Sequence, residues 1–267
     1  MPEVETIRRD LLPHVVGRRV TEADVRWPGT IQGLSPRDFR SRLLGRRVVG
    51  IGRRGKYFLF HLSEGWTLIV HLGMTGQLLT RPPEERAQSW TRVAFGLEGA
   101  RGLWFVDPRK FGRIYLVEDP DSVVGRLGPE PMEDRFSARQ LAELLERRSG
   151  ILKPLLLNQG FVAGVGNIYA DEALFAARLR PDRKADTLRP DEVVRLHRGI
   201  RRALRRGLRD AGSSVDFYRR PDGREGGHQE KFLVFRRTGE ACARCGTTIE
   251  RIVLGGRSTH FCPGCQL

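Results

Sequence analysis

The sequence predicts an α+β protein with a β-rich first half, a helical second half and a metal-binding C-terminus. Between Arg19 and Val117, short apolar runs alternate with Gly, Pro, Asp and Glu, which is typical of antiparallel strands. After Pro131, apolar residues recur every three to four positions, which favours helices. All four cysteines lie in the last 26 residues. With 267 residues, 39 % of them hydrophobic, the chain can bury a core, and we expect two domains.

The opening segment predicts a helix, because its apolar residues lie three to four positions apart at Val4, Ile7, Leu11, Leu12 and Val15. Pro2 suits the first turn of a helix, where a missing N–H costs nothing. A chemical interpretation stands beside this one. Removal of Met1 would make the Pro2 nitrogen a secondary amine, which could attack a sugar C1′ and form an iminium. Glu3 would then be placed to shuttle protons.

Six apolar runs predict the strands, at 47–51, 57–62, 67–72, 93–97, 102–106 and 113–117. Few helices lie between them, so we expect an antiparallel sandwich or barrel. Three turns among them carry unusual polar residues: 53–56 (Arg-Arg-Gly-Lys), 71–74 (His-Leu-Gly-Met) and 107–112 (Asp-Pro-Arg-Lys-Phe-Gly). Each turn is either a functional loop or a solvated turn whose Met or Phe packs into the core.

The second half begins with a linker at 127–131, where two prolines and a glycine precede the helical pattern. The pattern predicts helices at about 137–147, 151–158, 168–178 and 190–211. Two glycines before Asn167 allow a close backbone approach at a helix N-terminus, so either an anion site or simple capping explains them. The last of these helices carries seven arginines, and some of them must face solvent: Arg195, Arg198, Arg201, Arg202, Arg205, Arg206 and Arg209. The glycine-rich stretch 212–227 predicts a mobile, substrate-covering loop.

The four cysteines have zinc-ribbon spacing: Cys242 and Cys245 form one CxxC pair, and Cys262 and Cys265 form a second pair sixteen residues later. The alternative is two disulfides, which a chain of this size does not need. Four thiolates close the coordination shell, so we expect one structural Zn²⁺. Between the pairs, Arg257 follows two glycines, which indicates a basic hairpin that meets a phosphate backbone.

The charge agrees with a nucleic-acid partner. Lys and Arg number 47 against 32 Asp and Glu, which gives a net charge of +15 and a pI near 10.8. An arginine-rich thermophile surface is the alternative explanation. No apolar run approaches a membrane span of about 18 residues, and no signal-like segment opens the chain. We therefore expect a cytoplasmic protein, associated with the nucleoid through DNA, and no membrane partner.

Taken together, the motifs resemble bacterial formamidopyrimidine-DNA glycosylase, the MutM family of 8-oxoguanine glycosylases. They are the PEVET-IRR opening, RRGK, HLGM, DPRKFG, LGPEP, LKPLLL/NQ, GVGNIYADEALF, AGSS and GGRSTHFCPGCQ, in family order over essentially the whole chain. The resemblance implies two lobes: an N-terminal β-sandwich with flanking helices, and a helix-two-turns-helix domain with a zinc-ribbon β-hairpin. The boundaries we expect are a catalytic domain at 1–125, a linker at 126–133, a DNA-binding domain with its lesion-covering loop at 134–231, and a zinc ribbon at 232–267.

The resemblance also implies the chemistry. The family flips an oxidised purine out of duplex DNA, displaces it with an N-terminal proline amine and breaks the strand by β and δ elimination. Matching positions make Pro2, Glu3, Lys56 and Arg257 catalytic. The implied DNA contacts are Met74, Arg92, Arg109, Lys110, Phe111, Lys153 and Asn167. Arg109 would face the orphaned cytosine, and Phe111 would wedge the base stack. The implied partner is duplex DNA with an oxidised purine opposite cytosine, bound by a monomer.

The chain departs from the family at its start. The family begins Met-Pro-Glu-Leu-Pro-Glu-Val-Glu-Thr, whereas this chain begins Met-Pro-Glu-Val-Glu-Thr. If the gap follows Glu3, Pro2 and Glu3 are the nucleophile and the acid on a tether shortened by up to about 10 Å. If Met1 stands where the family has leucine, Pro2 and Glu3 match the family's second Pro-Glu pair. A start assigned three codons late would produce this second arrangement.

Two further interpretations stay open. The segment Ser89-Trp90-Thr91-Arg92 replaces residues among which the family commonly has histidine. The resemblance therefore predicts the lesion preference less directly than it predicts the fold. An endonuclease VIII-like enzyme shares the architecture and prefers oxidised pyrimidines, but PEVET and DPRKFG favour the purine enzyme. A second alternative is not an enzyme: the altered start suggests a paralogue that binds DNA without catalysis.

Overall fold

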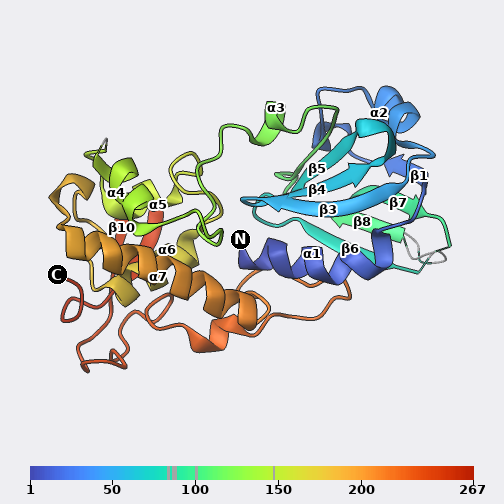
Figure 1. Ribbon diagram of the computed structural model, residues 1–267. Helices are drawn as coiled ribbons and strands as arrows, with labels where there is room; N and C mark the ends of the chain where they lie inside the picture. The colour runs from blue at the N-terminus through green and yellow to red at the C-terminus, as the bar shows by residue number, and fades with distance from the viewer. Residues whose placement is uncertain (83–84, 86–88, 100–101, 147) are drawn as a thin grey trace. The chain divides into compact units, whose positions relative to one another are not determined.

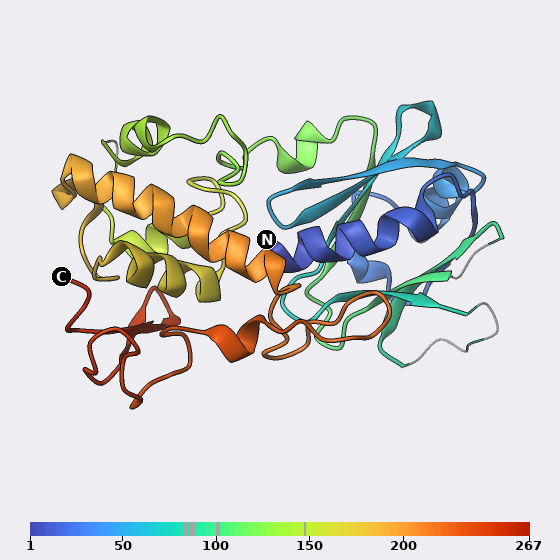
Figure 2. The same ribbon diagram turned by 60° about the horizontal axis from the view of Figure 1, so that its bottom comes forward.

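The chain forms two compact units. The computed structural model describes residues 1–82, 85, 89–99, 102–146 and 148–267. The sheet unit comprises Glu3–Arg126 and Ala211–Gly227, and the helical unit comprises Met1–Pro2, Leu127–Asp210 and His228–Leu267. Figures 1 and 2 show the elements of each unit. Within the described residues, no helix has the length and apolar character needed to cross a membrane.

The sheet unit contains two sheets (Figure 1). One has the strand order β1-β7-β8-β6, and the other has the order β2-β9-β5-β4-β3. Every pairing is antiparallel except that of β2 with β9, which is parallel. The strands are β1 (Val20–Val25), β2 (Ile31–Gln32), β3 (Val48–Arg54), β4 (Tyr57–Leu62), β5 (Thr67–His71), β6 (Gln77–Arg81), β7 (Thr91–Leu97), β8 (Gly102–Val106) and β9 (Arg113–Val117).

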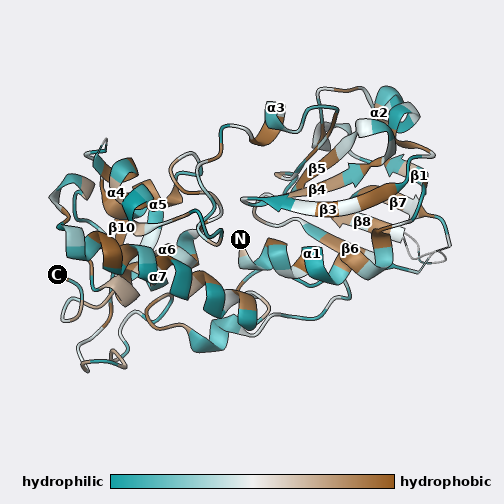
Figure 3. Ribbon diagram, viewed as in Figure 1, coloured by the Kyte–Doolittle hydropathy of each residue, from teal (hydrophilic) through white to brown (hydrophobic). Residues whose placement is uncertain are grey.

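One hydrophobic cluster joins the two sheets. It takes Phe58 and Phe60 from the five-stranded sheet, and Phe95 and Phe105 from the four-stranded sheet. Alternating burial along β7 turns every second side chain inward, as expected for a sheet with one face on the core. Figure 3 shows the apolar strand segments in brown. The sandwich alternative of the sequence analysis is therefore confirmed.

Helices α1 (Pro2–Val15) and α2 (Pro36–Leu43) pack on this cluster, and the short helix α3 (Asp121–Val124) follows the last strand. The predicted opening helix is confirmed: Ile7 and Leu11 of α1 are fully buried, and acidic side chains in its first turn complement the helix dipole. In α2, the Ser35 hydroxyl accepts a hydrogen bond from the Asp38 N–H at 3.1 Å, which caps the helix.

All six predicted strands are confirmed. Helices α2 and α3 and strands β1, β2 and β6 were not predicted. Strand β2 has only two residues. Strand β6 follows the polar turn at 71–74, and the sequence pattern does not distinguish it from that loop. Among the described residues, four 3₁₀ turns accompany these elements: Pro28–Thr30, Ser63–Gly65, Ala185–Thr187 and His228–Lys231.

The helical unit contains the four predicted helices as α4 (Ala138–Glu146), α5 (Leu152–Leu157), α6 (Asn167–Ala177) and α7 (Pro190–Arg209). Helix α7 packs closely on α6 because it has glycine at two contact points: Gly199 lies against the Ala173 carbonyl, and Gly207 lies against the Tyr169 ring. The hairpin of β10 (Glu250–Leu254) and β11 (Arg257–Phe261) packs on the opposite side of α6. Figure 2 shows α6 between α7 and the hairpin.

A charged cluster fixes α1 to β3 in the sheet unit. The Glu5 carboxylate accepts hydrogen bonds from Arg8 and Arg9 at 2.8 Å and lies 3.3 Å from the Arg53 guanidinium. Arg8 also donates to the Ile51 carbonyl of β3 at 3.1 Å. Burial raises the pKa of Glu5, but the hydrogen bonds from Arg8 and Arg9 outweigh it and hold this pKa at about 2. The ionised carboxylate therefore stabilises the folded unit.

Replacement of Glu5 by Gln tests this cluster. Because the folded pKa of Glu5 lies below its ordinary value of 4.5, the carboxylate's stabilisation is complete above pH 4.5 and is lost as pH falls towards 2. We expect Glu5→Gln to lower the free energy of unfolding by about 1–2 kcal/mol at pH 7, and by progressively less between pH 4.5 and 2.

Urea unfolding followed by tryptophan fluorescence measures this difference, because all four tryptophans lie in the sheet unit. Glu22→Gln, at an exposed position of β1, is the control. A wild-type advantage over Glu5→Gln that stays constant from pH 7 to pH 2.5 would contradict the role of the ionised carboxylate.

Candidate functional site

The four cysteines form one cluster. The sulfur atoms of Cys242, Cys245, Cys262 and Cys265 all lie within 4.8 Å of one another. The Cys242–Cys265 sulfur distance is 3.9 Å, and the Cys245–Cys262 distance is 3.4 Å. A tetrahedral Zn²⁺ with bonds of about 2.3 Å places its sulfur ligands about 3.8 Å apart. The cluster therefore fits one zinc ion, and its four thiolates leave no position for substrate, so this zinc is structural.

The zinc ribbon holds a tight hairpin. Leu254 pairs with Arg257, so Gly255 and Gly256 form a two-residue turn. Both have positive φ, at +54° and +71°, which the favoured two-residue hairpin turn requires and which glycine adopts without strain. Arg257 follows this turn with its side chain exposed. The structure thus places this predicted residue at the end of a rigid, metal-anchored element.

A buried ion pair lies beneath the hairpin. The Lys153 ammonium, with a fully buried side chain, lies 2.7 Å from the Asp171 carboxylate and donates a hydrogen bond to the Ser258 carbonyl at 2.6 Å. The other oxygen of Asp171 accepts hydrogen bonds from the His260 backbone N–H and ring Nδ1 at 2.9 and 3.1 Å. Burial lowers the pKa of Lys153. The Asp171 carboxylate raises this pKa, and the nearby positive charge of Arg257 lowers it further. Lys153 therefore holds β11 in place.

Asn167 lies beside this pair at the start of α6. Its side-chain amide donates to the same Ser258 carbonyl at 3.2 Å. A second buried carboxylate, Glu172, accepts backbone N–H groups of Leu233, Val234 and Phe235 at distances between 2.9 and 3.1 Å. Helix α6 thus anchors both the hairpin and the segment that leads to it.

The chain start belongs to the helical unit. The Met1 side chain is only 3 % exposed within that unit's hydrophobic cluster. Its ammonium donates to the Gly164 carbonyl at 3.0 Å. Pro2 is buried and begins α1. Met1 therefore occupies a core position, and the Pro2 nitrogen forms the peptide bond to it.

Glu3 belongs to the sheet unit and contacts the glycine-rich loop. Its carboxylate accepts the Ser213 N–H at 3.3 Å. The loop is anchored further along: Arg220 forms two hydrogen bonds of 2.8 Å with Asp10, and the Pro221 carbonyl accepts the Thr80 N–H at 2.8 Å. Residues 211–227 therefore pack as part of the sheet unit.

Lys56 lies at one end of the five-stranded sheet. It follows Gly55 in the two-residue turn between β3 and β4, and its charge acts on His71. The His71 ring lies 4.6 Å from the Tyr57 ring at a tilt of 36°, and residue His71 pairs with Arg113 of the neighbouring strand. Burial, together with the charges of Lys56 and Arg113, lowers the pKa of His71 to about 4. At neutral pH His71 is therefore uncharged and can act only as a hydrogen-bonding group.

Two loops that touch each other carry Met74, Arg109 and Phe111. Met74 and Phe111 are large apolar residues with exposed fractions of 52 % and 43 %. The Arg109 guanidinium lies over the Phe111 ring, 4.7 Å from its centroid. Gly73 fits against the Phe111 backbone so closely that an added Cβ would lie 2.8 Å from it. The structure therefore brings the predicted wedge residues onto adjacent loops of one unit.

Asp107 organises this pair of loops. Its carboxylate is completely buried and accepts the Gly112 N–H at 2.7 Å and the Thr75 hydroxyl, so it ties one loop to the other. Arg92 braces the same turn by donating to the carbonyls of Asp107 and Pro108 at 2.7 and 3.3 Å. Lys110 has a positive φ of 60°, and its ammonium lies 3.8 Å from the centroid of the Trp27 ring.

Three family models match the chain in order. They are the formamidopyrimidine-DNA glycosylase N-terminal domain at residues 1–114, the H2TH domain of the same glycosylase at 127–219, and the zinc finger found in FPG and IleRS at 239–267. A formamidopyrimidine-DNA glycosylase from Desulfitobacterium hafniense is 42 % identical over 271 residues, which cover 100 % of this chain and 99 % of the relative.

The chain belongs to the formamidopyrimidine-DNA glycosylase family.

Solved structures of the family agree in fold. The MutM (FPG) protein from Thermus thermophilus superposes with a TM-score of 0.91 at 43 % identity, covering 100 % of this chain and 98 % of that one. The Lactococcus lactis FPG (MutM) in complex with a FAPY-dG containing DNA gives 0.91 at 33 % identity, covering 99 % and 98 %. The family resemblance and the fold class expected from the sequence are confirmed.

Several residues of these sites were missed by sequence reasoning. The Asp171–His260 contact joins two motifs 89 residues apart, and no local pattern relates them. His71 lies in the quoted HLGM motif, but its proximity to Lys56 and Arg113 depends on strand register. Trp27 precedes a 3₁₀ turn, and its contact with Lys110 likewise depends on tertiary structure.

Loss of a zinc ligand should unfold the ribbon. Cys262 is fully buried and packs with Phe175, Val234 and Ile249, so the metal and this small core stabilise each other. We expect Cys262→Ser to reduce zinc retained after dialysis against a chelator from one equivalent to near zero, measured with a colorimetric indicator. Thr248→Ser, at an exposed position of the same ribbon, is the control. A Cys262→Ser protein that keeps one zinc would refute this assignment.

Proposed function

We propose that the chain is a base-excision-repair enzyme that removes oxidised purines, 8-oxoguanine and formamidopyrimidines, from duplex DNA. It then cleaves the strand at the resulting abasic site. The observation that carries this proposal is the pair of touching loops that present Met74, Arg109 and Phe111. Exposed apolar side chains next to an arginine head suit the space that a flipped base leaves in a duplex.

The wedge residues have separate tasks. Phe111 enters the base stack, while Met74 fills the position of the extruded purine. Arg109 hydrogen-bonds the orphaned base, and cytosine is the base that it prefers. Asp107, which is buried and tied to both loops, keeps the wedge rigid. Arg92 and Lys110 add positive charge beside it, and Arg92 also braces the turn.

Phosphates around the flipped nucleotide are held by Lys56, Asn167 and Arg257. Lys56 and Arg257 also take part in the proton transfers of strand cleavage. Lys153 is buried against Asp171, so its contribution is to position Ser258 and the hairpin that carries Arg257. The zinc ion keeps this hairpin folded and takes no part in the chemistry.

The chemistry requires an N-terminal proline amine. Its lone pair forms a bond to the sugar C1′ as the glycosidic C1′–N bond breaks, and the base leaves with a proton supplied by the adjacent glutamate. The proline nitrogen then loses its proton, the C1′–O4′ bond breaks and O4′ takes up a proton, so the sugar ring opens and C1′ and the nitrogen form an iminium. The iminium acidifies the neighbouring C2′–H. Loss of that proton expels the 3′ phosphate by β elimination, and a second deprotonation expels the 5′ phosphate by δ elimination.

Two alignments assign the nucleophile differently. In the first, Met1 is removed, and Pro2 and Glu3 are the nucleophile and the acid. In the second, Pro2 and Glu3 match the family's second Pro-Glu pair, and Met1 matches a leucine. Misplacing the amine by even about 1 Å would cost roughly 10²-fold in rate.

The proposal includes three further statements. The enzyme acts as a monomer, it prefers cytosine opposite the lesion, and it works in the cytoplasm in association with chromosomal DNA. The net charge of +15 supports binding to a polyanion.

Borohydride trapping on an 8-oxoguanine:cytosine duplex tests the proposal directly, because reduction converts the iminium to a stable protein–DNA adduct. The chain that begins Met-Pro-Glu-Val is compared with a longer chain that begins Met-Pro-Glu-Leu-Pro-Glu-Val. Equal trapping assigns the nucleophile to Pro2, whereas trapping by the longer chain alone assigns it to the added proline. If neither chain traps the duplex while both bind it, the enzyme proposal fails and a non-catalytic lesion binder remains. Faster excision from a thymine-glycol duplex would instead favour the pyrimidine-specific alternative.

Replacement of Arg109 by Ala tests the wedge. We expect the preference for cytosine over adenine opposite the lesion to fall by about 1–3 kcal/mol, because the bidentate contact to the orphaned base is lost. Single-turnover excision on the two duplexes measures the ratio. Arg139→Ala, on the exposed face of α4, is the control. An unchanged opposite-base ratio in Arg109→Ala would remove Arg109 from this role.

A further inference from the structure

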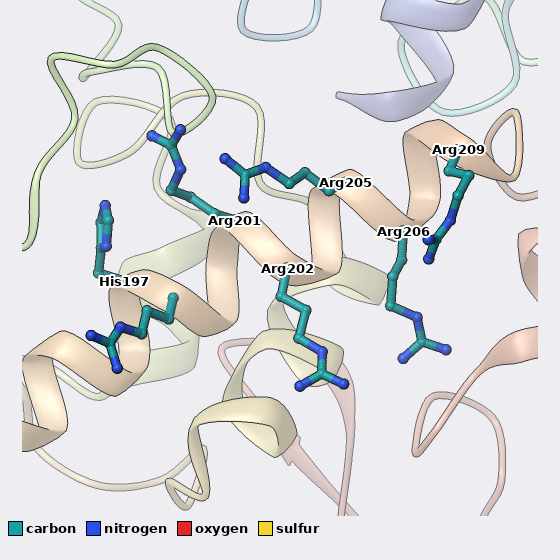
Figure 4. Close-up of a pocket in the computed structure, with 7 residues that line it drawn as sticks. His197, Arg201, Arg202, Arg205, Arg206 and Arg209 are labelled. Carbon is teal, nitrogen blue, oxygen red and sulfur yellow. The ribbon is translucent and has the colours of Figure 1, made fainter.

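The outer face of α7 carries a continuous row of arginines. Arg198, Arg202, Arg205 and Arg209 are all exposed and recur at the spacing of one helix face. We call these four residues the arginine row. With a rise of about 1.5 Å per residue, the row extends over about 16 Å. Together with His197, Arg201 and Arg206, it lines a shallow open groove (Figure 4).

The arginine row lacks acidic partners. From Val193 to Arg209, α7 contains no Asp or Glu. Arg195 pairs with Asp191, and Arg201 lies 3.7 Å from the exposed Asp134. Arg206 donates to the Lys231 carbonyl. In the part of the chain that the structure describes, no carboxylate lies within ion-pair distance of any of the four row arginines.

This arrangement does not serve the stability of α7. Like charges three and four residues apart on a helix repel each other, and each row arginine has such neighbours. The helix dipole favours cations only in the last turn, which accounts for Arg206 and Arg209. Arg198, Arg202 and Arg205 lie further from the C-terminus and receive no such compensation. Figure 4 shows the labelled arginine side chains extending to both sides of α7; among them, Arg201 and Arg206 donate to the backbone carbonyls of Glu133 and Lys231.

The arginine row lies on a different face of the helical unit from the hairpin. Gly199 and Gly207 turn the opposite side of α7 onto α6. Asp171 of α6 bonds to His260 of the hairpin, so α6 separates the two elements. Figure 2 shows the same order of layers. A phosphate backbone held by Asn167 and Arg257 therefore approaches a different side of this unit from one held by the row.

We propose that the arginine row is a second DNA-binding surface, which holds the backbone of an undamaged duplex independently of the lesion site. Duplex DNA carries one negative charge per about 1.7 Å of axis, so a straight row of four cations meets several phosphates along a straight helix. The row contains no aromatic side chain for stacking on single-stranded bases, so the duplex is the better fit. Binding of phosphates also relieves the repulsion between the arginines.

A second DNA-binding surface affects how the protein searches DNA for lesions. A protein that holds one duplex at the row can present its lesion site to a neighbouring segment, so it moves between segments without full release. Purely electrostatic contacts with phosphates carry no sequence information and weaken steeply with salt. The row therefore acts on undamaged DNA of any sequence.

A capture experiment with two duplexes tests the proposal. The full chain is bound to a bead-linked duplex that contains a tetrahydrofuran abasic-site analogue. A fluorescent, undamaged 20-base-pair duplex is then added at 50 to 200 mM KCl. The row variant carries Arg→Gln at 198, 202, 205 and 209. The control carries Arg→Gln at the exposed positions 135, 139, 148 and 189, which lie elsewhere on the same unit. Both variants lower the net charge from +15 to +11, so they have the same net charge, although Arg135, Arg139 and Arg189 of the control form ion pairs.

We expect the wild type and the control to capture the second duplex at 50 mM KCl and the row variant to capture none. The slope of log affinity against log salt for this second duplex should be about 3 to 4, as expected for four phosphate contacts. Protein retained on the beads is measured separately, so failure at the lesion site is distinguished from failure at the row.

Equal capture by the row variant and the wild type would overturn the proposal. Equal losses in both variants would also overturn it, because they would show an effect of net charge alone. Capture of phosphatidylglycerol vesicles but not of the duplex would assign the row to a membrane surface instead. Thermal unfolding and zinc content that match the wild type establish that the row variant is folded.

Discussion

The buried pair of Lys153 and Asp171 is the interaction on which the helical unit most depends. Neither charge has access to water, so each is stable only because the other is 2.7 Å away. Removal of one partner from such a pair typically costs about 3–5 kcal/mol, because the remaining charge stays buried. The pair also joins three elements, since Lys153 lies on α5, Asp171 on α6 and Ser258 on β11. An uncharged side chain in place of Lys153 would therefore loosen the hairpin and α6 together.

The zinc ribbon fixes the same hairpin through further contacts. Zinc closes the base of the ribbon through four thiolates, and the ion pair with Asn167 fixes the strand that begins at Arg257. Glu172 then attaches the connecting segment through three backbone N–H groups. Burial raises the pKa of Glu172 more strongly than these hydrogen bonds lower it. The hairpin is thus held by metal, charge and backbone hydrogen bonds at once, which keeps Arg257 at a fixed place on the helical unit.

The sequence predicted elements with a strong local pattern and missed those that depend on tertiary contacts. The strand 57–62 and the helix 190–209 follow directly from apolar periodicity. Helix α2 has a recognisable signature in Ser35, Pro36 and Asp38, but it lies in a region where strand patterns dominate. The cysteine spacing was sufficient to predict the metal site. The burial of Lys153 was not predictable, because its partner lies on another helix and a lysine side chain normally faces solvent.

The order in which the units are completed has a consequence for synthesis on the ribosome. The sheet unit takes its last segment, Ala211–Gly227, from far beyond its main body, which ends at Arg126. The 84 residues from 127 to 210 separate the two, which corresponds to about 4–17 s of translation. During that interval the Asp10 carboxylate lacks its hydrogen bonds from Arg220, and the Thr80 N–H lacks its acceptor, the Pro221 carbonyl. The sheet unit is thus incomplete until most of the helical unit has been synthesised, although all its strands precede Arg126.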